Sequence, residues 1–402
     1  MKQKPIVLAY LSVCCLFIAC NSQQVQKEEI VVIDVTKKYP EKEILLSDIA
    51  DITYVQMDES KDEYLYRGHP VRFSDNYFVI YNNATGDVLF FTKEGMPSSK
   101  FNRKGNGPGE YTMIYSQLVW YDEKKDDLYV RIKKNVDVFS STGDYKRSLP
   151  IPEDITPGEM MLLNDGSLIL FDQTEEFKKS NAHFGKDNDS PEEENPSRFI
   201  RIDSQTGDLL ETITLPKEHN VDFSLKLSNE GFVIVQFGSI KHLAPHPEGV
   251  LLHTQDTDTI YLYNNNKKTI SPAMVQNPPL ASLPIITYLN TFTETDTYQF
   301  IEYITIDKEN GKISSTCLIR DKSTGEIYTQ KIILDDFPQK EIFQNTRTMS
   351  STQDPRKVLI QLTVDELMEA YEKGQLKGKL KEKVASMDEE AENSVFAVVR
   401  FK

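Results

Sequence analysis

The chain repeats one short pattern four times: an apolar run, a Thr-Gly pair and a second apolar run. The four pairs are Thr85-Gly86, Thr142-Gly143, Thr206-Gly207 and Thr324-Gly325. A Gly between two apolar runs predicts a tight turn, because Gly adopts positive φ without a steric penalty. The pattern therefore predicts repeated β-hairpins, and it constrains the fold far more than it constrains any reaction.

The spacing of these turns indicates a repeat of β-sheets. Successive glycines lie 57, 64 and 118 residues apart, so the last interval is about twice the others. A degenerate copy at 260–263, followed by three Asn residues at 264–266, fills that interval, because Asn also tolerates positive φ. A period of about 60 fits four-stranded propeller blades with generous loops. Residues 25–402 would form six blades of about 63 residues or seven of about 54, and arithmetic leaves both counts open.

Almost every segment from 31 to 334 favours short strands, since runs of Val, Ile, Tyr and Phe alternate with Asp, Asn, Gly and Ser. One later region departs from this pattern. Thr363 and Glu366 fit a capping box. Apolar residues then follow at roughly helical spacing, at Leu367, Met368, Tyr371, Leu376 and Leu380. We therefore expect a helical insert at about 364–388. A final strand at 395–401 would let the two chain ends complete one shared blade and so satisfy its open edges.

The first 20 residues form a targeting segment. Lys2 and Lys4 precede an uncharged run of 15 residues at 5–19, which suits a signal peptide and is short for a membrane span of about 20. The run ends in LFIAC at 16–20, which resembles the bacterial lipobox, with Phe17 where Leu is usual. The resemblance implies a signal peptide at 1–19, lipidation of Cys20 and a tether at 20–30. A cleaved secretory signal with an incidental Cys is the alternative.

Cysteine content and charge exclude several classes of protein. Cys14 and Cys15 leave with the signal and Cys20 would carry lipid, so Cys317 alone remains and no disulfide can form within one mature chain. Removal of the signal peptide takes two Lys from the 46 basic residues. The remaining 44 basic residues and 62 acidic residues give the mature chain a net charge of −18. Such a chain repels nucleic acid, and we expect membrane contact only through the N-terminal lipid. We therefore expect the protein to be located at the outer membrane of the cell envelope, where it faces either the periplasm or the cell surface.

The segment GNGPGEY at 105–111 is the most distinctive heptapeptide. More strand follows it, and Pro108 lacks an N–H donor, so a structural turn is favoured over a phosphate-binding loop. Together with the strands and the Thr-Gly turn that follow, it resembles an NHL-type propeller blade. With the lipobox start, DTIY at 258–261 and the helical insert, the chain from about 30 to 402 is similar to the six-bladed β-propeller lipoproteins of Bacteroides and relatives. That resemblance implies an all-β, six-bladed propeller at 31–402, and it implies no catalytic residue.

Motifs for chemistry are sparse. The chain contains neither Gly-x-Ser-x-Gly nor His-Glu-x-x-His. His242 and His246 are four apart, but the neighbouring Pro245 and Pro247 disfavour the helix that would bring them to one face. The acidic stretch at 181–197 is read as a solvated loop, with a calcium site as the weaker alternative. No cofactor is expected, although a divalent metal ion stays possible.

We therefore expect a lipid-anchored binding or scaffold propeller whose ligand is a glycan, a peptide or a partner protein. Tyr111 and Tyr115 are the candidate ligand contacts, since exposed Tyr side chains suit sugar stacking and protein contact. The alternative is a metal-dependent hydrolase or lyase with its site at the mouth of the central channel. That alternative predicts several converging carboxylates, and an enzyme is the less expected of the two.

Overall fold

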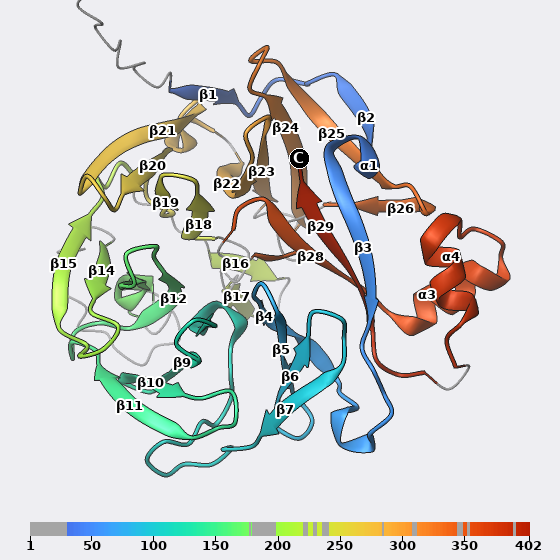
Figure 1. Cartoon of the computed structure of the whole chain (residues 1–402). Coiled ribbons are helices and arrows are strands. Elements are labelled where there is room, and N and C mark those ends of the chain that lie inside the picture. The colour runs from blue at the N-terminus through green and yellow to red at the C-terminus, as the bar shows by residue number, and fades with distance from the viewer. Residues whose placement is uncertain are drawn as a thin grey trace, which may run out of the picture.

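The computed structural model describes residues 30–402 except 177, 179–197, 220–223, 228–230, 235–240, 284, 308–311, 344–348, 352–353 and 389–390. The signal peptide, Cys20, most of the tether and the acidic loop at 181–197 therefore lie outside the described residues. The rest is built mainly of strands, which Figure 1 shows as sheets placed around a ring.

Five sheets each contain four strands that are consecutive in the chain, as in the blades of a β-propeller. Their strands are β4 (Gly68–Phe73), β5 (Tyr77–Asn82), β6 (Val88–Thr92) and β7 (Pro97–Phe101); β8 (Val119–Asp122), β9 (Asp127–Ile132), β10 (Asn135–Phe139) and β11 (Tyr145–Pro150); β12 (Pro157–Leu162), β13 (Leu168–Asp172), β14 (Arg198–Ile202) and β15 (Leu209–Thr214); β18 (Leu243–His246), β19 (Gly249–Leu252), β20 (Thr259–Asn264) and β21 (Thr269–Asn277); and β22 (Ile286–Glu294), β23 (Tyr298–Asp307), β24 (Lys312–Asp321) and β25 (Ile327–Leu334). The first strand of each blade lies innermost, because β4, β8, β12, β18 and β22 contact one another in that order.

A sixth sheet joins the two ends of the chain. It contains β27 (Met349–Ser351), β28 (Lys357–Leu362), β29 (Val395–Phe401) and the N-terminal strand β3 (Ala50–Gln56). β29 pairs with β3 antiparallel along its whole length, from Val395 opposite Gln56 to Phe401 opposite Ala50. The predicted shared sheet of N- and C-terminal strands is therefore confirmed.

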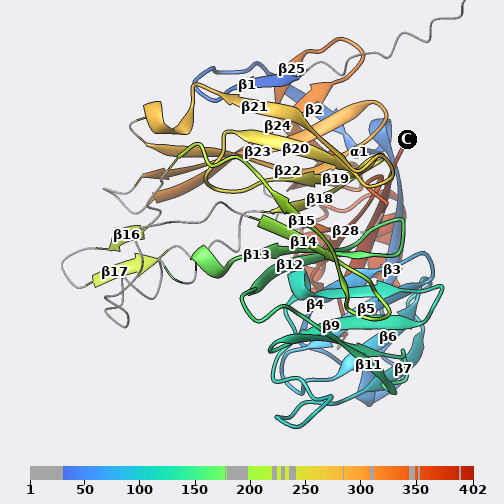
Figure 2. The same cartoon turned by 90° about the vertical axis from the view of Figure 1, so that its left-hand side faces the viewer.

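The predicted six-bladed propeller is wrong in its blade count: the described residues form five blades of four consecutive strands, and a separate composite sheet joins the chain ends. The N-terminal strands β1 (Val31–Asp34) and β2 (Glu41–Leu45) pair in parallel with the outer strands β21 and β25. β26 (Phe337–Ile342) also pairs with β25, and the hairpin β16 (Ser224–Leu227) and β17 (Gly231–Ile234) projects from the ring (Figure 2). Turn spacing could not reveal these additions, because a strand that joins a distant sheet leaves no local repeat.

The predicted turns are present. Gly143, Gly207 and Gly325 each join the third and fourth strands of a blade, with φ between 74° and 86°. The three Asn residues at 264–266 lie at the equivalent turn between β20 and β21. Gly86, with φ of 87°, instead joins the second and third strands of the first blade.

The helices among the described residues are short, and the two longest lie outside the ring (Figure 1). They are α1 (Leu46–Ile49), α3 (Val364–Glu372), α4 (Gly378–Ala385) and the 3-10 turns η1 (Asp62–Tyr64), η2 (Ser116–Leu118) and η4 (Leu280–Ser282). α3 and α4 occupy the segment in which the sequence predicts a helical insert, and the Thr363 side chain accepts a hydrogen bond from the Glu366 N–H as the predicted N-cap. In the part of the chain that the structure describes, no helix has the length and apolarity needed to span a bilayer.

Packing between sheets follows the strand sequences. The middle strands β5 and β13 are nearly continuous apolar runs and are buried on both faces, whereas the outer strand β11 exposes several residues. Cys317 on β24 is a buried free thiol, as its apolar surroundings in the sequence predict.

Candidate functional site: a polar cavity at the end of the channel

The innermost strands carry polar side chains to the axis of the ring. Arg72 lies on β4, Trp120 on β8, Glu159 on β12 and Asn290 on β22, while Lys241 lies two residues before β18. These residues are up to 218 positions apart in sequence. Only the closure of the ring makes them neighbours.

A cavity of about 810 Å³ opens at one end of this channel. The turns that follow the innermost strands form its wall, at 74–76, 122–125, 163–166, 246–247 and 354–357. Arg72 and Trp120 also line it. Its volume falls within the roughly 300–1,000 Å³ that is usual for small-molecule sites.

Five carboxylates and three lysines line the wall of this cavity, and each carboxylate has a partner in the protein. Asp75 pairs with Lys357, and Glu123 accepts a hydrogen bond from the Asn76 N–H at 3.1 Å. The remaining pairs are Asp122 with Lys125 at 3.6 Å, Asp165 with Arg201 at 2.6 Å and Asp354 with Arg356 at 3.1 Å. Because these contacts fix the carboxylates, the wall presents an ordered set of hydrogen-bond acceptors.

Arg72 is the cation of the cavity that is enclosed most deeply. Its guanidinium carbon lies 4.4 Å from the centre of the Trp120 ring, and Nη1 donates to the Val71 carbonyl at 2.8 Å. Its buried Nε has no hydrogen-bond partner among the described residues. Burial lowers the pKa of Arg72 to about 10, so the group stays charged at neutral pH. A charged donor group that is not fully satisfied is a binding feature for an anion.

Glu159 lies deeper in the channel. Its Oε2 accepts hydrogen bonds from the backbone N–H groups of His242 at 2.7 Å and Leu243 at 3.3 Å. Burial raises the pKa of Glu159 to about 7, and burial lowers the pKa of Lys241. Arg72 stays charged at neutral pH, so it supplies a positive charge at this end of the channel.

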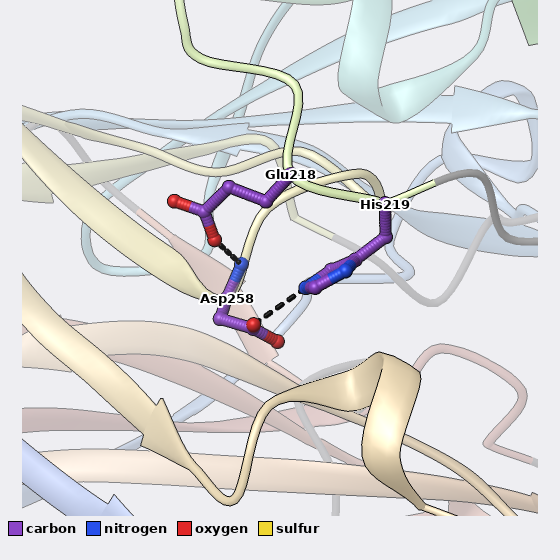
Figure 3. Close-up of side chains that lie close together, drawn as sticks. All are labelled: Glu218, His219 and Asp258. Carbon is purple, nitrogen blue, oxygen red and sulfur yellow. Dashed lines mark hydrogen bonds and ion pairs between the residues drawn. The ribbon is translucent and has the colours of Figure 1, made fainter.

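A second cluster, away from the channel, contains Glu218, His219 and Asp258 (Figure 3). His219 Nε2 lies 2.5 Å from Asp258 Oδ2, and Glu218 Oε2 accepts from the Asp258 N–H at 2.8 Å. Asp258 Oδ1 also accepts from the Leu280 N–H at 2.7 Å. Asp258 opens the DTIY segment singled out in the sequence, and these bonds fasten the connecting segment at 218–219 to that blade. The cluster sits at the start of a third strand rather than on a strand that lines the channel.

The two candidate tyrosines have different environments. Tyr111 is fully buried; its hydroxyl donates to the Gly86 carbonyl at 2.8 Å and accepts from the Arg103 N–H at 3.1 Å. It closes the GNGPGEY turn and offers no surface to a ligand in this conformation. Tyr115 is 51% exposed, and it precedes β8, at the opposite end of that strand from the cavity.

The histidines do not form a shared site. The His242 ring stacks on Phe171 with 3.7 Å between ring centres, whereas His246 lies on β18 at the cavity, 3.6 Å from Glu294. Sequence reasoning missed Arg72, Trp120 and Glu159, because each lies in an ordinary strand pattern. The one available signal was Trp120, the single Trp of the chain, in a predicted strand.

Fold and cavity together define a β-propeller with a polar cavity at one end of its channel. The chain belongs to the family described as a domain of unknown function, DUF4934, whose profile matches residues 30–400. It resembles the structure of a Bacteroides fragilis protein described as exported, with 18% identity and a TM-score of 0.61 over 93% of this chain and 100% of that one. A DUF4221 member from Bacteroides vulgatus matches at 10% identity and a TM-score of 0.48, over 88% and 97% of the chains. A search of curated protein sequences found no match.

Proposed function

We propose that this protein is an extracytoplasmic binding module, anchored by lipid on Cys20, that holds a ligand in the cavity at the end of its channel. Its ligand is a glycan, a peptide or a partner protein. The exported relative from Bacteroides fragilis supports the extracytoplasmic address. The resemblance to NHL-type blades and to lipoproteins of the outer membrane supports the same assignment.

One observation carries the proposal: the cavity of about 810 Å³ combines fixed carboxylates on its wall with the half-buried guanidinium of Arg72. Convergent polar groups in a preformed concavity are the usual signature of a ligand site. Tyr115 remains a candidate contact at the other end of the channel, where an exposed aromatic ring suits a protein or sugar surface.

The test is a binding screen of the full-length protein in detergent against glycan and peptide arrays. Lys124, exposed at the cavity, is replaced by Trp to fill the opening, and Lys379, exposed on α4, is replaced by Trp as the matched control. We expect Lys124→Trp to abolish binding of the ligands found and Lys379→Trp to retain it. Ligands that bind equally well to both variants would place the site elsewhere.

A metal-dependent hydrolase or lyase is the second candidate, and Glu218, His219 and Asp258 are the observation that favours it. One imidazole and two carboxylates within 4.8 Å of one another form a plausible ligand set for a divalent ion. Elemental analysis of the purified protein and of a His219→Ala variant, with lactone and glycoside hydrolysis assays, tests it. Absence of both bound metal and turnover in the parent protein would remove this candidate.

A further inference from the structure

The chemistry of the cavity allows its ligand to be described more closely, and this step rests on the function proposed above. We propose that the cavity binds an acidic sugar, with the ligand carboxylate held by Arg72 at the floor and the sugar hydroxyls held by the carboxylates of the wall.

The floor favours a carboxylate. A guanidinium presents its N–H donors in a planar fork that matches the two oxygens of a carboxylate. Trp120 contacts the Arg72 guanidinium at 4.4 Å and is itself only 3% exposed, so it positions the guanidinium rather than stacking on a ligand. Glu159 on β12 is the carboxylate whose charge acts on Arg72. No ion pair in the described part of the chain joins these two groups. Nη1 donates once to the Val71 carbonyl and Nε is buried, so the Nη2 group and the second N–H of Nη1 are the donors that remain for a ligand carboxylate.

The wall favours hydroxyl groups. Asp75, Asp122, Glu123 and Asp165 already take part in contacts with the protein, and each carboxylate has further lone pairs that accept hydrogen bonds. Sugar hydroxyls can donate to all of them, whereas a peptide offers only its sparser N–H groups. Three lysines, Lys124, Lys125 and Lys357, also line the wall and offset much of its negative charge. A uronate unit, with one carboxylate and several hydroxyls, satisfies both the guanidinium at the floor and the carboxylates of the wall.

Isothermal titration of the full-length protein with methyl glucuronide and methyl glucoside tests the carboxylate directly, since these probes differ at that group. We expect the glucuronide to bind at least about tenfold more tightly than the glucoside. One hydrogen-bonded pair of charged groups changes the dissociation constant by about that factor. Arg72→Gln should remove this preference, and Arg72→Lys should keep only part of it because Lys lacks the fork. Arg67→Gln is the matched control, because Arg67 is exposed just before the opposite end of β4, and it should leave the preference unchanged.

Equal affinity for the two probes in the parent protein, or a preference that survives Arg72→Gln, would overturn the inference. The comparison of probes on the parent protein stands even if a variant folds poorly. An acetylated dipeptide with a free carboxyl end that binds more tightly than the glucuronide would overturn the assignment to a sugar. If neutral ligands from the array screen bind and are lost with Lys124→Trp, the binding function stands while the acidic-sugar inference falls.

Discussion

At the scale of single residues, burial separates the polar groups that maintain the fold from those available to a ligand. The Tyr111 hydroxyl satisfies two backbone groups in the core, at Gly86 and Arg103. Arg72 is half-buried, its Nε lacks a partner among the described residues, and it lines a cavity. The first arrangement is typical of a structural residue, and the second is typical of a binding residue.

We expect Tyr111→Phe to destabilise the fold by about 1–3 kcal/mol, because it leaves the Gly86 carbonyl and the Arg103 N–H without their buried partner. Denaturant unfolding measures the change. Tyr115→Phe is the control, and its exposed side chain should alter the free energy of unfolding by no more than about 0.5 kcal/mol. A Tyr111→Phe protein as stable as its parent would show that the hydroxyl is not structural.

Two buried histidines predict a dependence of stability on pH. Burial lowers the pKa of His242 to about 4, and burial with the nearby His242 lowers that of His253 to about 3. Their unfolded values are 6.5, so stability is complete above pH 6.5 and falls as the pH drops toward 4, by about 1.4 kcal/mol per pH unit for each group. Glu159, whose folded pKa is raised, acts in the opposite sense between pH 4.5 and 7 and offsets part of this loss.

Unfolding free energies at pH 8 and pH 5 check this, with His253→Gln as the comparison. The free energy of unfolding of His253→Gln should depend on pH less steeply than that of the parent protein, by the equivalent of one bound proton. An identical slope would mean that His253 titrates in the folded protein as it does in the unfolded chain.

At the scale of elements, the turns were predictable and the site was not. A Gly at a tight turn is a local requirement of the backbone, so the Thr-Gly pairs revealed hairpins without knowledge of the fold. The capping residue Thr363 is local in the same sense. Arg72, Trp120 and Glu159 come from three different blades, and no local pattern records their convergence. The prediction that Tyr111 contacts a ligand failed for a related reason. The sequence beside a Gly-rich turn does not indicate whether a Tyr side chain points into the core or toward solvent.

Two glycine substitutions separate backbone strain from crowding. Gly325, with φ of 74°, has no atom within 4 Å of an added Cβ, so Gly325→Ala should cost only the strain of positive φ, about 1–2 kcal/mol. Gly143, with φ of 86°, would place a Cβ 2.5 Å from the Phe101 side chain, so Gly143→Ala should cost clearly more. Thermal and denaturant unfolding of both variants measure the difference, and equal costs would contradict the packing of this turn against β7.

At the scale of the whole molecule, the composite sheet holds the ring together. β29 pairs with β3, and its Phe396 stacks on Phe78 of the first blade with 5.5 Å between ring centres. The sequence predicted this closure from its terminal strand, but it did not predict β1 and β2 as outer parallel strands. Their partners lie more than 240 residues away, and hydrophobic patterning does not specify a partner strand.

We expect Phe396→Ala to destabilise the whole protein by about 3–5 kcal/mol, because it empties a fully buried aromatic site at the closure. Calorimetry should show one transition at a lower temperature, and Phe396→Leu should lose less. A separate early transition, with the other blades unaffected, would show that closure is not coupled to the rest of the fold.

The central claim is that a ligand binds at the channel end formed by the turns after the innermost strands. Hydrogen–deuterium exchange of the full-length protein, with and without a ligand from the screen, tests it most directly. We expect slower exchange at 74–76, 122–125 and 163–166, with no change at 112–116 near Tyr115. Protection at 112–116 together with unchanged exchange in the three turns would contradict it.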